Sequence, residues 1–440
     1  MNIYQKLKFA QTNFMEKEKE PGTRVYFVID MKSFYASVEC AERGLDPMES
    51  KLVVADITRT AGSVCLAVSP ALKALGIKNR CRLYEIPKNI DFQIAPPRMK
   101  KYIEYAAEIY GIYLKYIDKS DIHVYSIDEC FIDATDYLKI YKLSSKEFAE
   151  KLMSEITNTL HIPCSCGIGT NLYLAKIALD IMAKHAPDRI GLLTEESYRK
   201  LLWDHQPLSD FWQVSTGTIQ RLSKHGIYTM KEITECDENI LYKEFGINAE
   251  LLIDHAWGKE PCLMSDIKNY HSKSRSISSS QILPCNYNFK DAKIVMLEMV
   301  QNGCYDLMKN HFVTNSVHLY IGYGDKTKSA KGGKRMSVTT NLFSKISKYA
   351  EKLFDEIVDK NRPIRRIAYN FPDLIPEENE QYDFFTDTQK VEKEKKLTKS
   401  ILALHEKYGK NSLLKGIDLK ENATQIERNR QIGGHKSGEN

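Results

Sequence analysis

Hydrophobic spacing divides the first part of the chain into strand-like and helix-like segments. The run VYFVID (residues 25–30) is rich in β-branched and aromatic side chains and ends in an acid, which is typical of a buried strand. Phe34, Val38 and Ala41 follow at helical spacing, and Gly44 ends that helix. The same patterns predict a hairpin formed by residues 52–57 and 63–68, helices over 99–116, 146–160 and 172–186, and a small all-helical unit over 197–258.

The pattern changes after residue 271. Residues 272–283 begin a strand-rich region, which continues as a helix, two strands, a second helix and a last strand. This β-α-β-β-α-β order is that of a ferredoxin-like module. A polar tail begins near Pro376, and one helix-like stretch in it has a shared apolar face formed by Leu397, Ile401, Leu404 and Tyr408.

The stretch VYSIDECF (residues 124–131) joins an alternating apolar run to two neighbouring carboxylates. Side chains alternate along a strand, so we expect Asp128 and Glu129 on opposite faces, close to a tight reversal of the chain. Acids at a strand end are mostly solvated, and this is one interpretation. The other is a metal site, which needs a third carboxylate, and Asp30 ends an earlier predicted strand.

Three carboxylates at neighbouring strand ends cannot all stay ionised unless cations lie between them. Oxygen-only ligation is typical of Mg²⁺ or Mn²⁺. Two such ions about 3.5–4 Å apart suit an in-line phosphoryl displacement. Spacing along the chain does not by itself bring Asp30 to Asp128.

Size and charge add to this picture. A chain of 440 residues with 42% hydrophobic residues is expected to fold into roughly two to four globular domains. Its net charge of +5 is small, but residues 266–376 contain 18 Lys and Arg against 10 Asp and Glu. That surplus suits a domain lying along a phosphate backbone, although a solvated basic face has the same composition.

Cysteine spacing and hydropathy argue against several classes of protein. The 10 cysteines are irregularly spaced and form no CxxC pairs, which argues against a zinc site and for reduced thiols. No apolar run reaches the length of a membrane span, and residues 1–24 lack the apolar core of a secretory signal. We expect a soluble, cytoplasmic protein without membrane contact.

Three motifs in order, VIDMKSFYASVE, YSIDECFID and GIGTNLYLAKIALDIMAK, resemble the palm and fingers of Y-family, or translesion, DNA polymerases. The likeness is greatest to the UmuC- and UvrX-like branch of Gram-positive bacteria and their mobile elements. It implies an α+β right-hand polymerase with a ferredoxin-like palm, small fingers, an all-helical thumb and a β-α-β-β-α-β little finger. The implied divisions are an N-terminal extension (1–24), palm (25–31 and 92–186), fingers (32–91), thumb (187–262), linker (263–271), little finger (272–376) and tail (377–440).

The resemblance implies roles for the acids and their neighbours. Asp30 and Asp128 would bridge two Mg²⁺ ions, or Mn²⁺, and Glu129 would bind the ion that activates the primer 3′-hydroxyl. Met31 would contribute its backbone carbonyl. Tyr35 falls at the aromatic steric gate that excludes a 2′-hydroxyl, with Phe34 supporting it, although a tyrosine here is about as often a core residue.

Two lysines match the family's triphosphate contacts. Lys176 matches the lysine that holds the triphosphate, and Lys73 matches a second cation. Pro70 and Lys73 stand where DinB-like relatives have Tyr and Arg, so an ammonium replaces a bidentate guanidinium. We expect a differently shaped grip on the triphosphate.

The DNA-binding regions depart from the family in part. In the thumb, residues 213–215 replace the Gly-x-Gly turn of relatives. In the little finger, the predicted phosphate contacts are Lys273 and Arg275, followed by Arg365 and Arg366. Such contacts position a duplex without reading its sequence.

The tail contains QYDFF, which resembles a sliding-clamp-binding peptide. Its anchors would be Gln381, Tyr382, Phe384 and Phe385. Packing back onto the little finger is the alternative. The last residues, ERNRQIGGHKSGEN, have the composition of a basic, disordered arm.

These features predict an error-prone translesion DNA polymerase that acts as a monomer, without proofreading, on primer–template DNA and dNTPs. A sliding clamp and damage-response accessory proteins are the expected partners. A catalytically silent DNA- or clamp-binding regulator would keep the fold, but it has no need for three acids that repel DNA. A nucleotidyl cyclase shares the palm-like fold and the two-metal chemistry, but it does not grip a duplex.

Overall fold

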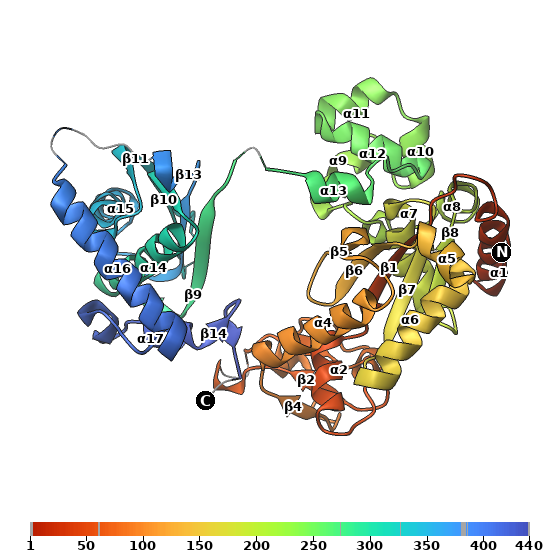
Figure 1. Cartoon of the computed structure of the whole chain (residues 1–440), viewed down its shortest axis with the longest axis horizontal. Helices are drawn as coiled ribbons and strands as arrows, with labels where there is room; N and C mark the ends of the chain where they lie inside the picture. Colours follow the sequence, from red (N-terminus) through yellow and green to blue (C-terminus); the bar gives the residue numbers. More distant parts are fainter. Residues whose placement is uncertain are drawn as a thin grey trace. The chain divides into compact units, whose positions relative to one another are not determined.

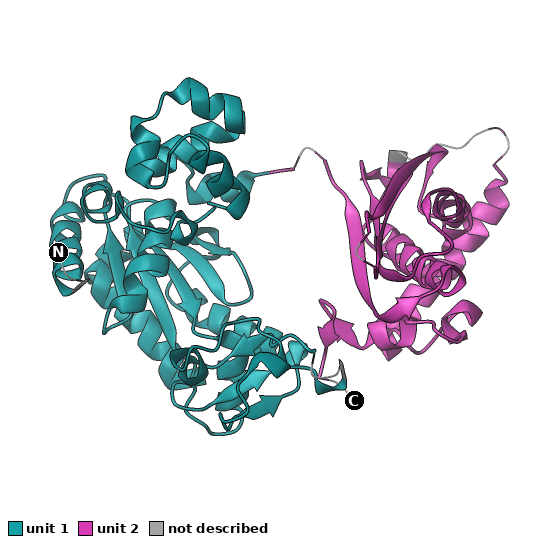
Figure 2. Cartoon of the chain, turned by 180° about the vertical axis from the view of Figure 1, so that it is seen from behind, with its two compact units in different colours: residues 1–270 teal, residues 271–440 magenta. Residues whose placement is uncertain are grey.

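The computed structural model describes residues 3–59, 62–272, 274–325, 327–379, 384 and 386–438. The chain forms two compact units, residues 1–270 and 271–440, shown in Figures 1 and 2. The first spans the predicted palm, fingers and thumb, and the second spans the predicted little finger and tail. No helix in the described part of the chain is long and apolar enough to cross a bilayer.

A five-stranded sheet in the order β5-β6-β1-β7-β8 forms the centre of the first unit. Its strands are β1 (Tyr26–Met31), β5 (Ile122–Val124), β6 (Glu129–Asp133), β7 (Cys164–Gly169) and β8 (Ile190–Leu193). β7 and β8 are parallel, and the other neighbours are antiparallel. β8 extends the palm sheet past residue 186, where the palm was predicted to end. That boundary was wrong because a strand of 4 residues next to a helix is too short to show a period.

Helices cover both faces of this sheet (Figure 1). On one face, α4 (Met99–Leu114) and α6 (Ser145–Leu160) pack on Phe27 and Ile29 of β1. On the other face, α7 (Leu172–Ile177) and the π-helical turn η4 (Ala178–Met182) cover Tyr26 and Val28. The alternation of side chains along β1 therefore decides which helices its acid meets. The remaining helices of the palm and N-terminal segment are α1 (Ile3–Lys17), which packs on β8, and α5 (Thr135–Tyr141).

The fingers contain a three-stranded sheet in the order β3-β2-β4. Its elements are α2 (Phe34–Ala41), β2 (Leu52–Val54), β3 (Ala67–Val68), α3 (Pro70–Ala74) and β4 (Gln93–Ala95). The antiparallel pairing of β2 with β3 is that of the predicted hairpin. The thumb is helical, as predicted, and with the segment after it comprises α8 (Glu195–Leu202), α9 (Thr216–Ser223), α10 (Met230–Glu235), α11 (Glu238–Phe245), α12 (Asn248–Trp257) and α13 (Met264–Asn269).

The second unit has the predicted β-α-β-β-α-β order of elements. These are β9 (Ile277–Tyr287), α14 (Phe289–Lys309), β10 (Phe312–Tyr323), β11 (Ala330–Thr340), α15 (Phe343–Ile357) and β12 (Ile364–Phe371), followed by β13 (Ile375–Pro376). The sheet order is β11-β10-β12-β9, with β13 beside β10. β12 thus lies between β9 and β10, whereas a ferredoxin-like module places its third strand there. The order of elements along the chain does not determine the order of strands in the sheet.

The tail folds against the helical side of this unit. It contains α16 (Thr388–Tyr408), η8 (Gly416–Leu419), α17 (Gln425–Asn429), β14 (Gln431–Ile432) and β15 (His435–Lys436). The Glu298 carboxylate on α14 is 1% exposed and accepts the backbone N–H groups of Thr424 at 2.9 Å and Gln425 at 3.2 Å. The expectation of a disordered C-terminal arm was wrong, because a buried carboxylate caps the first turn of α17.

Candidate active site

Two of the predicted acids, Asp30 and Glu129, face each other across adjacent strands. Asp30 lies near the end of β1, and its Cα is paired with that of Glu129 at the start of β6. Opposed residues of an antiparallel pair project to the same face, with Cβ atoms about 4.5–5.5 Å apart. On its other side, Asp30 is paired with Ser165 of β7. The register brings both carboxylates to the sheet face that α7 covers.

Asp128 lies in the turn between β5 and β6, not within a strand. The Glu129 carbonyl accepts two N–H groups of this turn, at 3.0 and 3.1 Å, and closes the hairpin. The Asp128 carbonyl accepts the N–H of Met31 at 3.0 Å, which ties the turn to the end of β1. The predicted alternation of Asp128 and Glu129 along one strand was wrong, because these hydrogen bonds reverse the chain just before Glu129.

Burial and mutual repulsion perturb the acids. The pKa of Asp30 is raised to about 7, first by burial and then by the charges of Asp128 and Glu129. Burial also raises the pKa of Glu129, although the attraction of Lys176 opposes it. The surroundings of Asp30 therefore contain too little positive charge to keep its carboxylate fully ionised near neutral pH. A divalent cation would supply that charge.

The available donors fit a hard divalent cation. The carboxylates of Asp30, Asp128 and Glu129 and the backbone carbonyl of Met31 are oxygen ligands of the kind Mg²⁺ binds. Glu129 Oε1 is buried, and its charged partner is the Lys176 ammonium at 2.9 Å. Within the described ranges, no group of three or more His, Cys, Asp or Glu side chains is close enough together to hold a metal ion.

Lys176 on α7 forms ion pairs with Glu129 and Asp180. Its Nζ lies 2.9 Å from Glu129 Oε1 and donates a hydrogen bond to Oε2 at 3.0 Å. It also lies 3.2 Å from Asp180. Burial lowers the pKa of Lys176, but the charges of Asp180 and Glu129 outweigh it, so that the pKa is raised. Sequence patterns did not single out Asp180, although its position four residues after Lys176 was a usable signal.

Two glycines of β7 let α7 lie close to the sheet. A Cβ atom at Gly167 would lie 2.1 Å from the Ala175 carbonyl oxygen, and one at Gly169 would lie 2.1 Å from the Ala175 nitrogen. Neither position has room for a side chain. The GIG sequence thus has a physical role, because it brings the backbone of α7 close enough for Lys176 to reach Glu129.

Tyr35, the predicted steric gate, is half-buried beside the acids. Its ring stacks on Tyr102, with centroids 4.6 Å apart and planes at 23°. Burial and then the charge of Asp128 raise the pKa of Tyr35. Ser33, at φ 50°, turns the chain from β1 into α2 in a left-handed conformation, which is common at functional sites. Phe34 is 3% exposed and belongs to the palm core.

Lys73 and Lys32 lie within electrostatic reach of Asp30, and Lys184 lies within reach of Lys73. The pKa of the exposed Lys73 on α3 is lowered first by partial burial and then by Lys184 and Lys32, while Asp30 opposes this. Sequence patterns did not indicate Lys32 or Lys184. The three lysines come from separate segments, so their proximity is a property of the fold.

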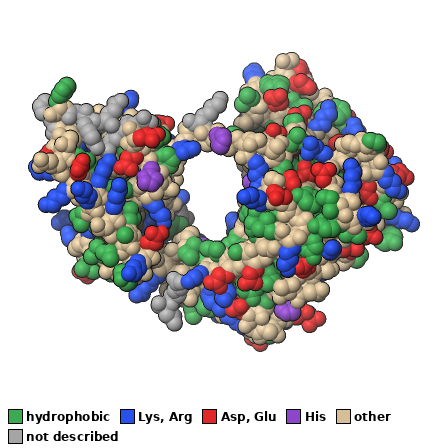
Figure 3. Space-filling view, viewed as in Figure 1, with side chains coloured by type: hydrophobic (Ala, Val, Ile, Leu, Met, Phe, Trp, Pro, Cys, Tyr) green, Lys and Arg blue, Asp and Glu red, His purple; other side chains and the backbone are tan. Residues whose placement is uncertain are grey.

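The open face of the little-finger sheet carries basic side chains. Arg366 of β12 is exposed, and its guanidinium carbon lies 5.6 Å from the centroid of the Tyr320 ring. Three further side chains, His318, Lys331 and Arg335, are exposed on the same face. The sequence analysis did not name them, although the alternation of side chains along β10 and β11 was a usable signal. Figure 3 shows Lys and Arg side chains spread over the visible face of this unit, with acids among them.

Of the other predicted DNA contacts, Arg275 and Arg365 do not share the exposed sheet face on which Arg366 lies. Arg275 is exposed before β9, 5.3 Å from the Phe312 ring centroid. Arg365 is half-buried at a shift in the pairing register of β12. Lys273 lies outside the described residues. In the thumb, Gln213 has φ 68° and takes the left-handed conformation that a glycine would adopt most easily.

The predicted clamp-binding peptide lies mostly outside the described residues, which exclude Gln381, Tyr382 and Phe385. Phe384 is described, and its side chain is fully exposed.

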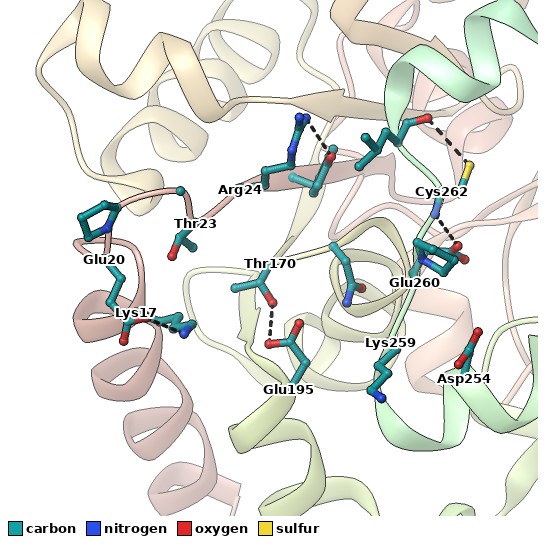
Figure 4. A pocket seen from close by; sticks show the side chains of 16 residues that line it. Lys17, Glu20, Thr23, Arg24, Thr170, Glu195, Asp254, Lys259, Glu260 and Cys262 are labelled. Atoms are coloured by element: carbon teal, nitrogen blue, oxygen red, sulfur yellow. Dashed lines mark hydrogen bonds and ion pairs between the residues drawn. The ribbon is translucent and has the colours of Figure 1, made fainter.

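A cavity of about 630 Å³ lies apart from these acids, between the segment after α1, the palm and the thumb (Figure 4). Lys17, Arg24 and Lys259 line it together with acids. Several lining groups are already paired, including Thr170 with Glu195 at 3.2 Å. None of the predicted catalytic residues lines this cavity.

A solved structure shares the fold. A Y-family DNA polymerase chimera of Dbh and Dpo4 is similar with a TM-score of 0.62, over 80% of this chain and 99% of that chain, at 20% identity. The fold is therefore that of a right-hand polymerase of mixed α+β class with a little finger, as predicted.

The sequence profile of the impB/mucB/samB family matches residues 29–180, and that of the family's C-terminal domain matches residues 274–384. The chain belongs to this family, the Y-family of DNA polymerases. UvrX of Bacillus subtilis, named as a UV-damage repair protein, is 31% identical over 93% of this chain and 97% of its own. DNA polymerase IV 2 of Halalkalibacterium halodurans is 27% identical, over 94% of this chain and 99% of its own. The predicted family is confirmed.

Proposed function

We propose that this protein is a DNA-directed DNA polymerase that adds deoxynucleotides to a primer 3′-hydroxyl and copies past damaged template bases. The observation that carries the proposal is the pairing of Asp30 with Glu129 across β1 and β6, beside Lys176 on α7. A protein that only binds DNA gains nothing from clustered acids, because they repel phosphates.

Asp30, Asp128, Glu129 and the Met31 carbonyl would hold two Mg²⁺ ions, with Mn²⁺ as a substitute. When bound, such ions lower the pKa of the primer hydroxyl and stabilise the charge on the leaving pyrophosphate. Asp30 has to lose its proton to serve as a ligand, since its pKa is about 7. Glu129 has to exchange its contact with Lys176 for a contact with a cation.

The cations beside the acids suit a triphosphate. Lys176, once released from Glu129, can bind phosphate oxygens, and Lys73, Lys32 and Lys184 add positive charge nearby. Tyr35, held against Tyr102, would exclude a ribose 2′-hydroxyl by steric contact.

The little finger would hold the primer–template duplex. Arg366, Lys331 and Arg335 on its open face, with Arg275 beside it, offer contacts to phosphates. The QYDFF peptide would dock on a sliding clamp, and damage-response proteins would act as accessory partners of a monomeric enzyme.

Primer extension with Mg²⁺, on an abasic and an undamaged template, tests the proposal. Extension should be lost in Asp128→Ala and Glu129→Ala. The wild type should reject ribonucleotides, and Tyr35→Ala should accept them. A wild type that fails to extend any primer, even with a sliding clamp present, would instead favour a catalytically silent regulator.

A further inference from the structure

Two cysteines of the fingers stand opposite each other on neighbouring extended segments. Val64 and Arg82 form an antiparallel bridge. The Cys65 N–H donates to the Cys81 carbonyl at 2.8 Å, and the Leu83 N–H donates back to the Ser63 carbonyl at 3.0 Å. These two bonds frame the bridge, so that Cys65 faces Cys81.

This register suits a disulfide. Directly opposed residues of antiparallel segments have Cα atoms about 4.5–5.5 Å apart and side chains on the same face. A disulfide needs a Cα separation of about 4.4–6.8 Å. Both cysteine side chains pack in the same apolar cluster of the fingers, which also contains Val53, Val68 and Leu72.

The two thiols differ in their access to solvent. Cys65 is 0% exposed, whereas Cys81 is half-buried. Burial first, and then the charge of Cys81 and a hydrogen bond between the side chains, raise the pKa of Cys65 to about 12. Cys81 is thus the thiol that an oxidant meets first.

We propose that Cys65 and Cys81 form a redox-active pair that closes a reversible disulfide in the fingers. With a peroxide as oxidant, the Cys81 sulfur displaces one oxygen as water and becomes a sulfenic acid. The Cys65 sulfur then attacks the Cys81 sulfur, and a second water leaves as the S–S bond forms. In sum, two thiols lose two hydrogens and hydrogen peroxide becomes two waters. A dithiol reverses the reaction by exchange.

The disulfide would join the segment before β3 to the loop that carries Arg80. Arg80 has φ 60°, and its charge partly opposes the rise in the pKa of Tyr35, so that this loop lies within electrostatic reach of the predicted gate. Oxidation is therefore expected to change the fit of the incoming nucleotide. This consequence rests on the proposed function, whereas the chemistry of the pair does not.

Hydrogen peroxide, applied to the full chain in a Cys285→Ser background, is the probe. This background removes an exposed thiol. After alkylation and digestion, mass spectrometry should find a peptide joining Cys65 to Cys81, which dithiothreitol separates. Cys81→Ser should abolish this product. Cys236→Ser, which removes another half-buried thiol, should leave it unchanged. Recovery of Cys81 as a sulfinic acid, with Cys65 still a thiol, would overturn the proposal.

Steady-state primer extension gives the second readout. Oxidised protein should have a several-fold higher KM for dNTP, restored by dithiothreitol, and Cys81→Ser should show no such change. An unchanged KM in fully cross-linked protein would overturn the link to nucleotide binding. Absence of extension from reduced protein would contradict the proposed function. Mass spectrometry would still show, independently of activity, whether the cross-link between Cys65 and Cys81 forms.

Discussion

The ammonium group of Lys176 lies 2.9 Å from Glu129 Oε1, and the two side chains are 10% and 9% exposed. Asp180 shares the same ammonium from one turn further along the helical segment. One lysine thus holds two acids that would otherwise repel each other in a poorly solvated place. Metal binding at Glu129 and release of Lys176 are expected to occur together.

Removing this ammonium should destabilise the metal-free protein. Lys176→Ala leaves Glu129 buried without its partner, which typically costs about 3–5 kcal/mol of the free energy of unfolding. Urea denaturation in the presence of a chelator measures this loss. Lys115→Ala is the matched control, because it breaks an exposed ion pair with Glu155 and should cost about 1 kcal/mol or less. Equal losses in the two variants would contradict the interpretation.

Asp30 should make stability depend on pH. Its pKa is about 7 in the folded protein, against about 3.9 in an unfolded chain, so the folded state holds the proton more tightly. Metal-free stability attributable to this group therefore falls as the pH rises from about 4 to about 7.

Asp30→Asn removes this contribution and should raise the melting temperature at pH 8 without metal. Added Mg²⁺ should stabilise the wild type at pH 8 and have a smaller effect on the variant. A metal-free variant that melts below the wild type at pH 8 would argue against the raised pKa.

The close approach of α7 to the sheet should depend on Gly167. Gly167→Ala places a methyl group 2.1 Å from the Ala175 carbonyl oxygen, so it should lower stability strongly and disrupt the contact between Lys176 and Glu129. Gly111→Ala in α4 is the matched control. That position has open space, and alanine should stabilise the helix by about 0.5–1 kcal/mol. Thermal unfolding of both variants should therefore show shifts of opposite sign.

The open face of the little finger should contribute to DNA affinity through charge. Arg366→Ala is expected to weaken binding about equally on all sequences and to reduce the salt slope by about 1. Fluorescence anisotropy over a salt series measures both quantities. Arg362→Ala serves as a control, because this guanidinium already binds Asp359 at 2.9 Å. A sequence-dependent loss in Arg366→Ala would indicate base contacts.

Glu298 should hold the tail in place. Glu298→Ala removes the acceptor of the first N–H groups of α17, so residues 410–438 should exchange hydrogen and be cut by proteases faster than in the wild type. Glu427→Ala, an exposed change within α17, should leave this protection intact. If the tail stays protected without Glu298, its docking rests on other contacts.

Local patterns identified much of the candidate site. Asp30, Asp128, Glu129 and Lys176 stand in motifs whose residue types suit metal and phosphate binding. The structure pairs Asp30 with Glu129 across β1 and β6, places Lys176 against Glu129, and leaves Asp128 in the turn before β6. The same patterns failed for Asp128, which was expected within a strand. Alternation describes a strand but cannot locate the residue at which backbone hydrogen bonds reverse it.

The sequence by itself determined the family, the order of elements in both units and the residue types of the site, because these depend on local periodicity and on motifs. Tertiary structure alone decided which residues meet. Lys32, Lys73 and Lys184 come from separate segments, and Glu298 binds Thr424 across 126 positions. Such contacts leave no local pattern, since they arise from strand register, the close approach of α7 and the burial of a carboxylate.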